Sequence, residues 1–164
     1  MSLSEATEGD IASVSKQLGR PARDIVAIAA RCICGNPIVV QTKPRLEDGT
    51  PFPTVYYLTL PAATSAISTL EATGLMAELQ QRLLKEPDLA EQYSLAHQSY
   101  LADRNLLGEV EEIRDISAGG MPQRVKCLHA LAAHSLAKGA GVNPIGDIAL
   151  EMCSWKQNRC QCAE

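Results

Sequence analysis

The sequence predicts an α+β fold, in which a small N-terminal β-sheet of about three strands is packed by four or more α-helices. Two observations lead to this prediction. Three runs rich in β-branched or aromatic residues lie between residues 25 and 60, whereas beyond Pro61 apolar residues recur at spacings of three and four. The chain has 164 residues, a length that suits one domain. We therefore expect a single globular domain over residues 1–155 and a mobile polar tail over residues 156–164.

The first part of the chain is expected to supply the sheet. Residues 10–18 carry apolar side chains at helical spacing and predict a short helix. Residues 25–31 fit a buried strand or a short helix, and their β-branched side chains favour the strand. Residues 38–42 and 54–60 predict two further strands. The loop between these two, residues 43–53, contains Asp-Gly and Pro-Phe-Pro turn sequences.

The rest of the chain is expected to be mainly helical. Prolines stand where helices would begin and glycines where they would end, which is the usual asymmetry. The expected helices run from Pro61 to a cap at Gly74, from Pro87 to near Gly108, from Pro122 to Lys138, and from a cap at Asn143 to about Trp155. The acidic segment 109–116 allows no assignment.

Charge and composition exclude several classes of partner. The net charge of -4 argues against broad nucleic-acid binding, and no run approaches the roughly 20 apolar residues of a membrane span. The acidic N-terminus lacks the features of a secretory signal, so we expect a cytoplasmic protein whose six cysteines are thiols or metal ligands. Residues 20–45 carry five basic residues against one acidic, whereas residues 71–115 carry ten acidic against four basic. A solvated acidic helical face accounts for this asymmetry; the alternative is a positive surface that suits a small anionic ligand.

The segment from Ser117 to Asp147 concentrates the polar chemistry and suggests an anion site. Gly119 and Gly120 lead into a predicted helix whose first turns carry Arg124 and Lys126. A helix start offers free N–H groups and a positive dipole end, and glycines let a ligand approach the backbone. A plain turn between helices accounts for the same pattern. The residues expected on the opposite side of the ligand are Arg31, Arg45, Asp48 and Thr50.

Two further interpretations involve Cys127. Together with Cys32, Cys34 and His129 it offers four sulfur or nitrogen ligands, the set that zinc prefers, although buried inert thiols are more common. Alternatively, Cys127 is a reactive thiol beside Lys126, with His129 as its base. The two cysteines of the tail receive no role.

Several long motifs resemble a known family. They include RCICGNPIVV, PRLEDGTPFPTVYYLT, LEATGLM and GGMPQRVKCLHALAAH. This chain is similar, from about Arg20 to Leu150, to an uncharacterised and chiefly actinobacterial family, domain of unknown function 501. The resemblance includes the candidate residues named above and assigns none of them a role.

The leading hypothesis is a protein that binds a small anion, such as a phosphate ester or nucleotide, at the helix start between Gly119 and Cys127. The sequence leaves open whether it is an enzyme. The alternative is a non-enzymatic adaptor for a protein partner, with a structural zinc held by Cys32, Cys34 and Cys127.

Overall fold

A four-stranded antiparallel sheet occupies the N-terminal half of the molecule. The structure is a computed structural model that describes residues 3–162. The strands are β1 (Ser4–Glu5), β2 (Ile25–Arg31), β3 (Pro37–Thr42) and β4 (Tyr56–Leu58), and they lie in the order β1-β2-β3-β4. The α+β prediction is confirmed. Strand β1 was missed because two residues are too few to show an alternating pattern.

Six α-helices and one 3₁₀ turn complete the described part of the chain. They are α1 (Glu8–Leu18), α2 (Pro61–Glu71), α3 (Leu75–Lys85), α4 (Pro87–Asn105), η1 (Glu111–Ile113), α5 (Leu128–Lys138) and α6 (Pro144–Met152). Over the described residues, every helix is too short or too polar to cross a membrane.

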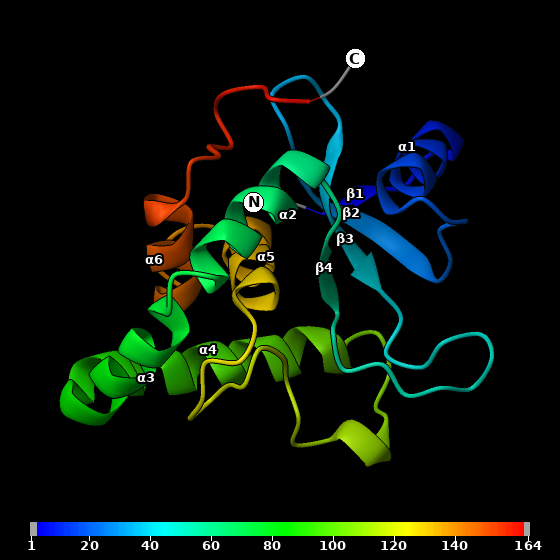
Figure 1. Ribbon diagram of the computed structural model, residues 1–164. Helices are drawn as coiled ribbons and strands as arrows, with labels where there is room; N and C mark the ends of the chain where they lie inside the picture. The colour runs from blue at the N-terminus through cyan, green and yellow to red at the C-terminus, as the bar shows by residue number, and fades with distance from the viewer. Residues whose placement is uncertain (1–2, 163–164) are drawn as a thin grey trace.

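Helices cover both faces of the sheet, as Figure 1 shows. On one face, α1 packs through Val14 against Ile28 and Val40 in a small apolar cluster. The other face supports the main core, to which α2 to α6 all contribute, and α5 contributes the largest continuous buried surface. The chain then leaves α6 and passes across the molecule toward the tip of the β2–β3 hairpin (Figure 1).

Two buried polar side chains organise this core. Arg104 of α4 is 2 % exposed and donates hydrogen bonds to the backbone carbonyls of Pro53, Ile113 and Ile116, which fixes the two long loops against the helix. His134 of α5 is fully buried, stacked on Tyr56 and edge-on to Tyr100.

A hydrogen bond from Asn143 defines the protonation of His134. The Nδ2 group of Asn143 donates to Nδ1 of His134 at 3.1 Å, and the Oδ1 atom of Asn143 accepts from the Gly146 amide, which fixes the orientation of the amide. The ring proton of neutral His134 therefore lies on Nε2, which has no hydrogen-bond partner among the described residues. Burial lowers the pKa of His134 to about 4.

The helix predicted from Pro122 begins instead at Leu128, with Cys127 as its N-cap. Side chains from distant helices use the backbone groups that a longer helix would need. Gln80 accepts a hydrogen bond from the Val125 amide, and Tyr93 donates one to the Arg124 carbonyl. The last helix likewise ends at Met152 rather than near Trp155.

The third predicted strand is also shorter than expected, covering Tyr56–Leu58 of residues 54–60. At its start, the amides of Val55 and Tyr56 donate to the hydroxyl of Tyr100 instead of to a neighbouring strand. Tertiary contacts thus decide where these elements begin.

Candidate metal centres

Four cysteines from opposite ends of the sequence meet at the tip of the β2–β3 hairpin. They are Cys32, Cys34, Cys160 and Cys162, and their four sulfur atoms all lie within 4.8 Å of one another. The sulfur atoms of Cys34 and Cys162 are 3.5 Å apart, and all four cysteines are free thiols. Cys32 is buried, Cys162 is half-buried and the other two are exposed.

A tight turn brings the first cysteine pair together. The amide of Cys32 donates to the Asn36 carbonyl and the amide of Gly35 donates to the Cys32 carbonyl, both at 2.8 Å. Gly35 has a φ of 94°, a conformation that glycine adopts without strain. The chain is therefore folded back over Cys34 rather than extended through it.

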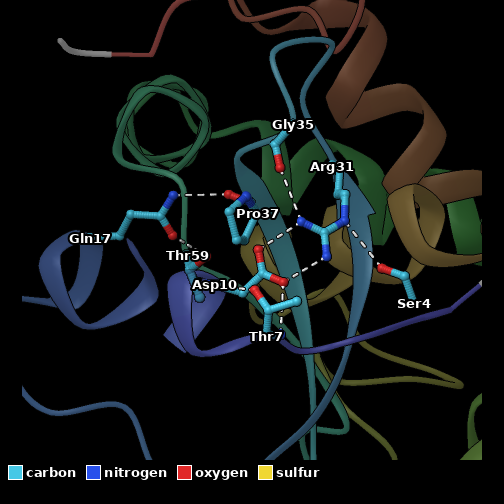
Figure 2. Close-up of polar contacts among 8 residues, drawn as sticks. All are labelled: Ser4, Thr7, Asp10, Gln17, Arg31, Gly35, Pro37 and Thr59. Atoms are coloured by element: carbon cyan, nitrogen blue, oxygen red, sulfur yellow. Dashed lines mark hydrogen bonds and ion pairs between the residues drawn. The ribbon is translucent and has the colours of Figure 1, made fainter. Parts of the chain in front are cut away.

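A network centred on Arg31 fixes this turn in place (Figure 2). The Arg31 guanidinium pairs with both carboxylate oxygens of Asp10 at 2.8 Å and also donates to Ser4 and to the Gly35 carbonyl. The bidentate pair holds the pKa of Asp10 far below its usual range, although burial opposes this shift. Gln17 of α1 donates to the Pro37 carbonyl in the same network (Figure 2). Arg31, predicted as a ligand-binding residue, is thus engaged in fixing the hairpin.

The tail is anchored on its way to the hairpin. The ammonium group of Lys156 donates to the carbonyls of Leu150 and Glu151 at the end of α6. Trp155 is buried in the main core, and Gln157 donates to the Arg31 carbonyl at 3.4 Å. These contacts deliver Cys160 and Cys162 to the hairpin tip.

Three of the four thiols have shifted pKa values. Burial raises the pKa of Cys32, and it raises the pKa of Cys162 to about 12. The backbone N–H of Asn36 instead lowers the pKa of the Cys34 thiol to about 7, with help from Cys162. The Cys34 thiol therefore has a lower pKa than those of Cys32 and Cys162.

A second group consists of Glu71, Cys127 and His129, whose ligand atoms also lie within 4.8 Å of one another. Glu71 ends α2, and the other two stand at the start of α5. Burial raises the pKa of Cys127, but His129 and the Ala130 amide together lower it by more, so the net pKa is below the usual value. The Cys127 side chain in turn raises the pKa of His129, against the effect of burial.

The predicted metal set is thus divided between two groups. Cys32 and Cys34 lie with the tail cysteines, and Cys127 and His129 lie with Glu71. Sequence reasoning missed Cys160, Cys162 and Glu71. The repeated Cys-x-Cys spacing was the signal for the first two, whereas an isolated glutamate at the end of a helix gives no signal.

The start of α5 already has an anionic neighbour. The Glu71 carboxylate accepts from the Leu128 amide at 2.8 Å, which is the position that a bound anion would take. Arg124 and Lys126 are exposed on the segment before the helix. Gly119 and Gly120 both have positive φ, and a Cβ atom on either would lie under 3.0 Å from a neighbouring atom. Tight packing thus accounts for these glycines.

The loop residues expected opposite the anion are also engaged. Arg45 forms an ion pair with Glu112 at 2.7 Å. Asp48 accepts from the Thr50 amide at 2.9 Å, and this contact lowers the pKa of Asp48. Anion binding by these residues stays a prediction.

Comparison with known proteins places the chain in a family. A family model described as "Protein of unknown function (DUF501)" matches residues 28–151, which are 124 of the 164 residues. The matched segment contains both sets of residues except Cys160 and Cys162, which lie beyond it. No curated protein and no solved structure matches the chain.

Proposed function

We propose that this chain, which belongs to the family of proteins of unknown function 501, is a zinc-binding protein whose metal fastens the C-terminal tail to the β2–β3 turn. The observation that carries the proposal is the convergence of four cysteine sulfurs within 4.8 Å. The ligands would be Cys32, Cys34, Cys160 and Cys162.

The spacing of the sulfur atoms fits a zinc ion. With a zinc–sulfur bond of about 2.3 Å, two ligands of a tetrahedral site lie about 3.8 Å apart. The Cys34–Cys162 distance of 3.5 Å and the limit of 4.8 Å for all pairs bracket this value. Rotation of the thiol side chains, two of which are exposed, is enough to complete the tetrahedron.

Four protein ligands close the coordination sphere, so this centre is structural rather than catalytic. It supports the adaptor interpretation of the sequence, with Cys160 and Cys162 in place of Cys127. The metal would also shape one wall of a hollow between the hairpin and the tail, lined in part by Ile33, Leu150 and Trp155. Ile33 is 67 % exposed there and offers an apolar contact to a protein partner.

Metal analysis tests the proposal. Reduced protein, purified without a metal-affinity tag, is expected to carry about one more zinc ion per chain than the double variant Cys34→Ser, Cys160→Ser. The matched control is Cys153→Ala, since Cys153 belongs to neither group and should leave the zinc content unchanged. Equal zinc content in wild type and the double variant would refute the proposal. So would a Cys34–Cys162 disulfide in protein kept under reducing conditions.

Limited proteolysis tests the role of the metal in anchoring the tail. Trypsin cleavage after Arg159 should be slow in zinc-loaded protein and fast after chelation, because the metal would hold Cys160 and Cys162, which directly follow the cleaved bond. The double variant should be cleaved quickly with or without zinc. Identical cleavage rates in all samples would show that the tail is not held by metal.

A further inference from the structure

The group of Glu71, Cys127 and His129 lies where α2 ends and α5 begins. The Nδ1 atom of His129 is 3.2 Å from Oε1 of Glu71, and both side chains are about one quarter exposed. Cys127 is half-buried. The group is therefore packed enough to be rigid but remains within reach of solvent.

The hydrogen bonds around His129 determine which of its ring nitrogens carries the proton of the neutral ring. Its Nε2 atom lies 3.1 Å from the carbonyl oxygen of Thr64 and 3.1 Å from the hydroxyl of Ser68. A backbone carbonyl only accepts hydrogen bonds, so Nε2 must carry the proton of a neutral ring. The lone pair of Nδ1 then points at the Glu71 carboxylate, and two acceptors face each other at 3.2 Å. A cation between them, either a proton on Nδ1 or a metal ion, removes this conflict.

The same arrangement is what a metal-binding histidine requires. A histidine that ligates zinc through one nitrogen usually donates from the other to a backbone carbonyl or carboxylate, which fixes the tautomer. Here Thr64 supplies that carbonyl. The contact orients the free Nδ1 lone pair toward the Glu71 carboxylate.

Glu71 is oriented in a comparable way. Its Oε2 atom accepts from the Leu128 amide at 2.8 Å, so this oxygen is occupied. The Oε1 atom is directed to Nδ1 of His129, and a carboxylate oxygen of Glu71 lies within 4.8 Å of the Cys127 sulfur. One oxygen, one nitrogen and one sulfur atom thus converge, each from a side chain fixed by a helix end.

We propose that Glu71, Cys127 and His129 form a second zinc site, which has three protein ligands and a fourth position open to water. The mixed oxygen, nitrogen and sulfur ligands suit zinc, and three protein ligands with one free position are typical of catalytic rather than structural zinc. Zinc in such a site lowers the pKa of its bound water to about 7 and polarises carbonyl or phosphoryl oxygens. The site does not depend on the four-cysteine centre, because the two share no residue.

Cobalt(II) is a suitable probe, because it binds zinc sites and a cobalt–thiolate bond absorbs light. In the variant Cys34→Ser, Cys160→Ser, titration with cobalt(II) should still give a thiolate band, weaker than that of wild type because the four-cysteine centre has lost two of its thiolates. Adding Glu71→Gln or His129→Gln should weaken cobalt and zinc binding at least about tenfold. The control is Lys126→Gln, an exposed neighbour outside the ligand set, which should bind as before.

A second measurement covers the case in which the double variant folds poorly. In otherwise wild-type protein, Glu71→Gln should reduce the zinc content by about one ion per chain and leave the four-cysteine centre loaded. In otherwise wild-type protein, zinc should also protect Cys127 from alkylation by iodoacetamide, because a metal-bound thiolate is shielded; peptide mapping identifies the alkylated cysteine.

The opposing outcome is a salt bridge without metal. If protonated His129 alone satisfies Glu71, the cobalt titration of the double variant will show no thiolate band, and zinc will not slow alkylation of Cys127. Either result overturns the second site and leaves the four-cysteine centre untouched. Loss of that centre alone would appear instead as equal metal content in wild type and the double variant.

Discussion

When the pH falls from 7 to 5, the variant His134→Leu is expected to lose about 2 kcal/mol less unfolding free energy than wild type. The histidine is fully buried, and burial lowers its pKa from 6.5 to about 4. Protonation would also place a second N–H on Nδ1, facing the donor group of Asn143. Leucine has a similar volume, lacks a titrating group and can pack against Tyr56 and Tyr100.

The sign follows from proton binding in the two states. Because the folded pKa lies below the unfolded one, the unfolded chain binds more protons between about pH 6.5 and pH 4. The unfolding free energy is therefore not reduced by this histidine above pH 6.5. It falls as the pH decreases from 6.5 toward 4, because protons then bind the unfolded chain but not the folded one. A fall of the pKa from 6.5 to about 4 corresponds to about 3 kcal/mol at full protonation, of which about 2 kcal/mol is lost by pH 5.

Urea unfolding of metal-free, reduced protein at about pH 7 and pH 5 measures this effect, read as the difference between wild type and His134→Leu. The difference is necessary because two other histidines titrate nearby. Burial lowers the pKa of His97, which acts in the same direction, and Cys127 raises the pKa of His129, which acts in the opposite one. If both proteins lose the same stability on acidification, the buried neutral histidine is not the cause.

Two other predictions concern packing. Arg104→Met should cost about 3–5 kcal/mol in urea unfolding, because a buried guanidinium and its hydrogen bonds to three backbone carbonyls are lost. Arg114→Met, at a side chain 70 % exposed, should change stability by less than about 0.5 kcal/mol. Gly146→Ala should cost about 3 kcal/mol or more, since its Cβ would lie 2.1 Å from the Leu131 carbonyl oxygen; Gly9→Ala, with its nearest neighbour at 3.7 Å, should stabilise by up to about 1 kcal/mol. Equal effects within either pair would contradict the packing argument.

Local pattern was enough to predict the fold class, because strands and helices leave their own periodicity in the sequence. It was not enough to predict where elements begin. The segment before α5 has good helical composition, yet Gln80 and Tyr93 hold its backbone in another conformation. Such long-range hydrogen bonds leave no mark in a single sequence. Because of these hydrogen bonds, Arg124 lies outside α5, although the sequence predicted it within this helix.

Only some ligands of the candidate sites could be predicted, for a similar reason. Cys32 with Cys34 and Cys127 with His129 are close pairs in the sequence, and the structure keeps each pair together. What completes each pair comes from elsewhere: the tail in one case and the end of α2 in the other. Spacing identified the ligands that are neighbours and could not identify the distant ones, since their approach depends on the tertiary fold.

Helix α2 explains why the two pairs do not combine into one site. Its first turn, at Pro61 and Ala62, lines a hollow together with Cys162, and its last residue is Glu71. From Pro61 to Glu71 the helix rises about 15 Å. A zinc ion needs all of its ligands within about 2.3 Å, so one ion cannot serve groups at both ends of this helix. Two centres at opposite ends of a rigid helix should fill independently, and removing one metal should leave the affinity of the other unchanged.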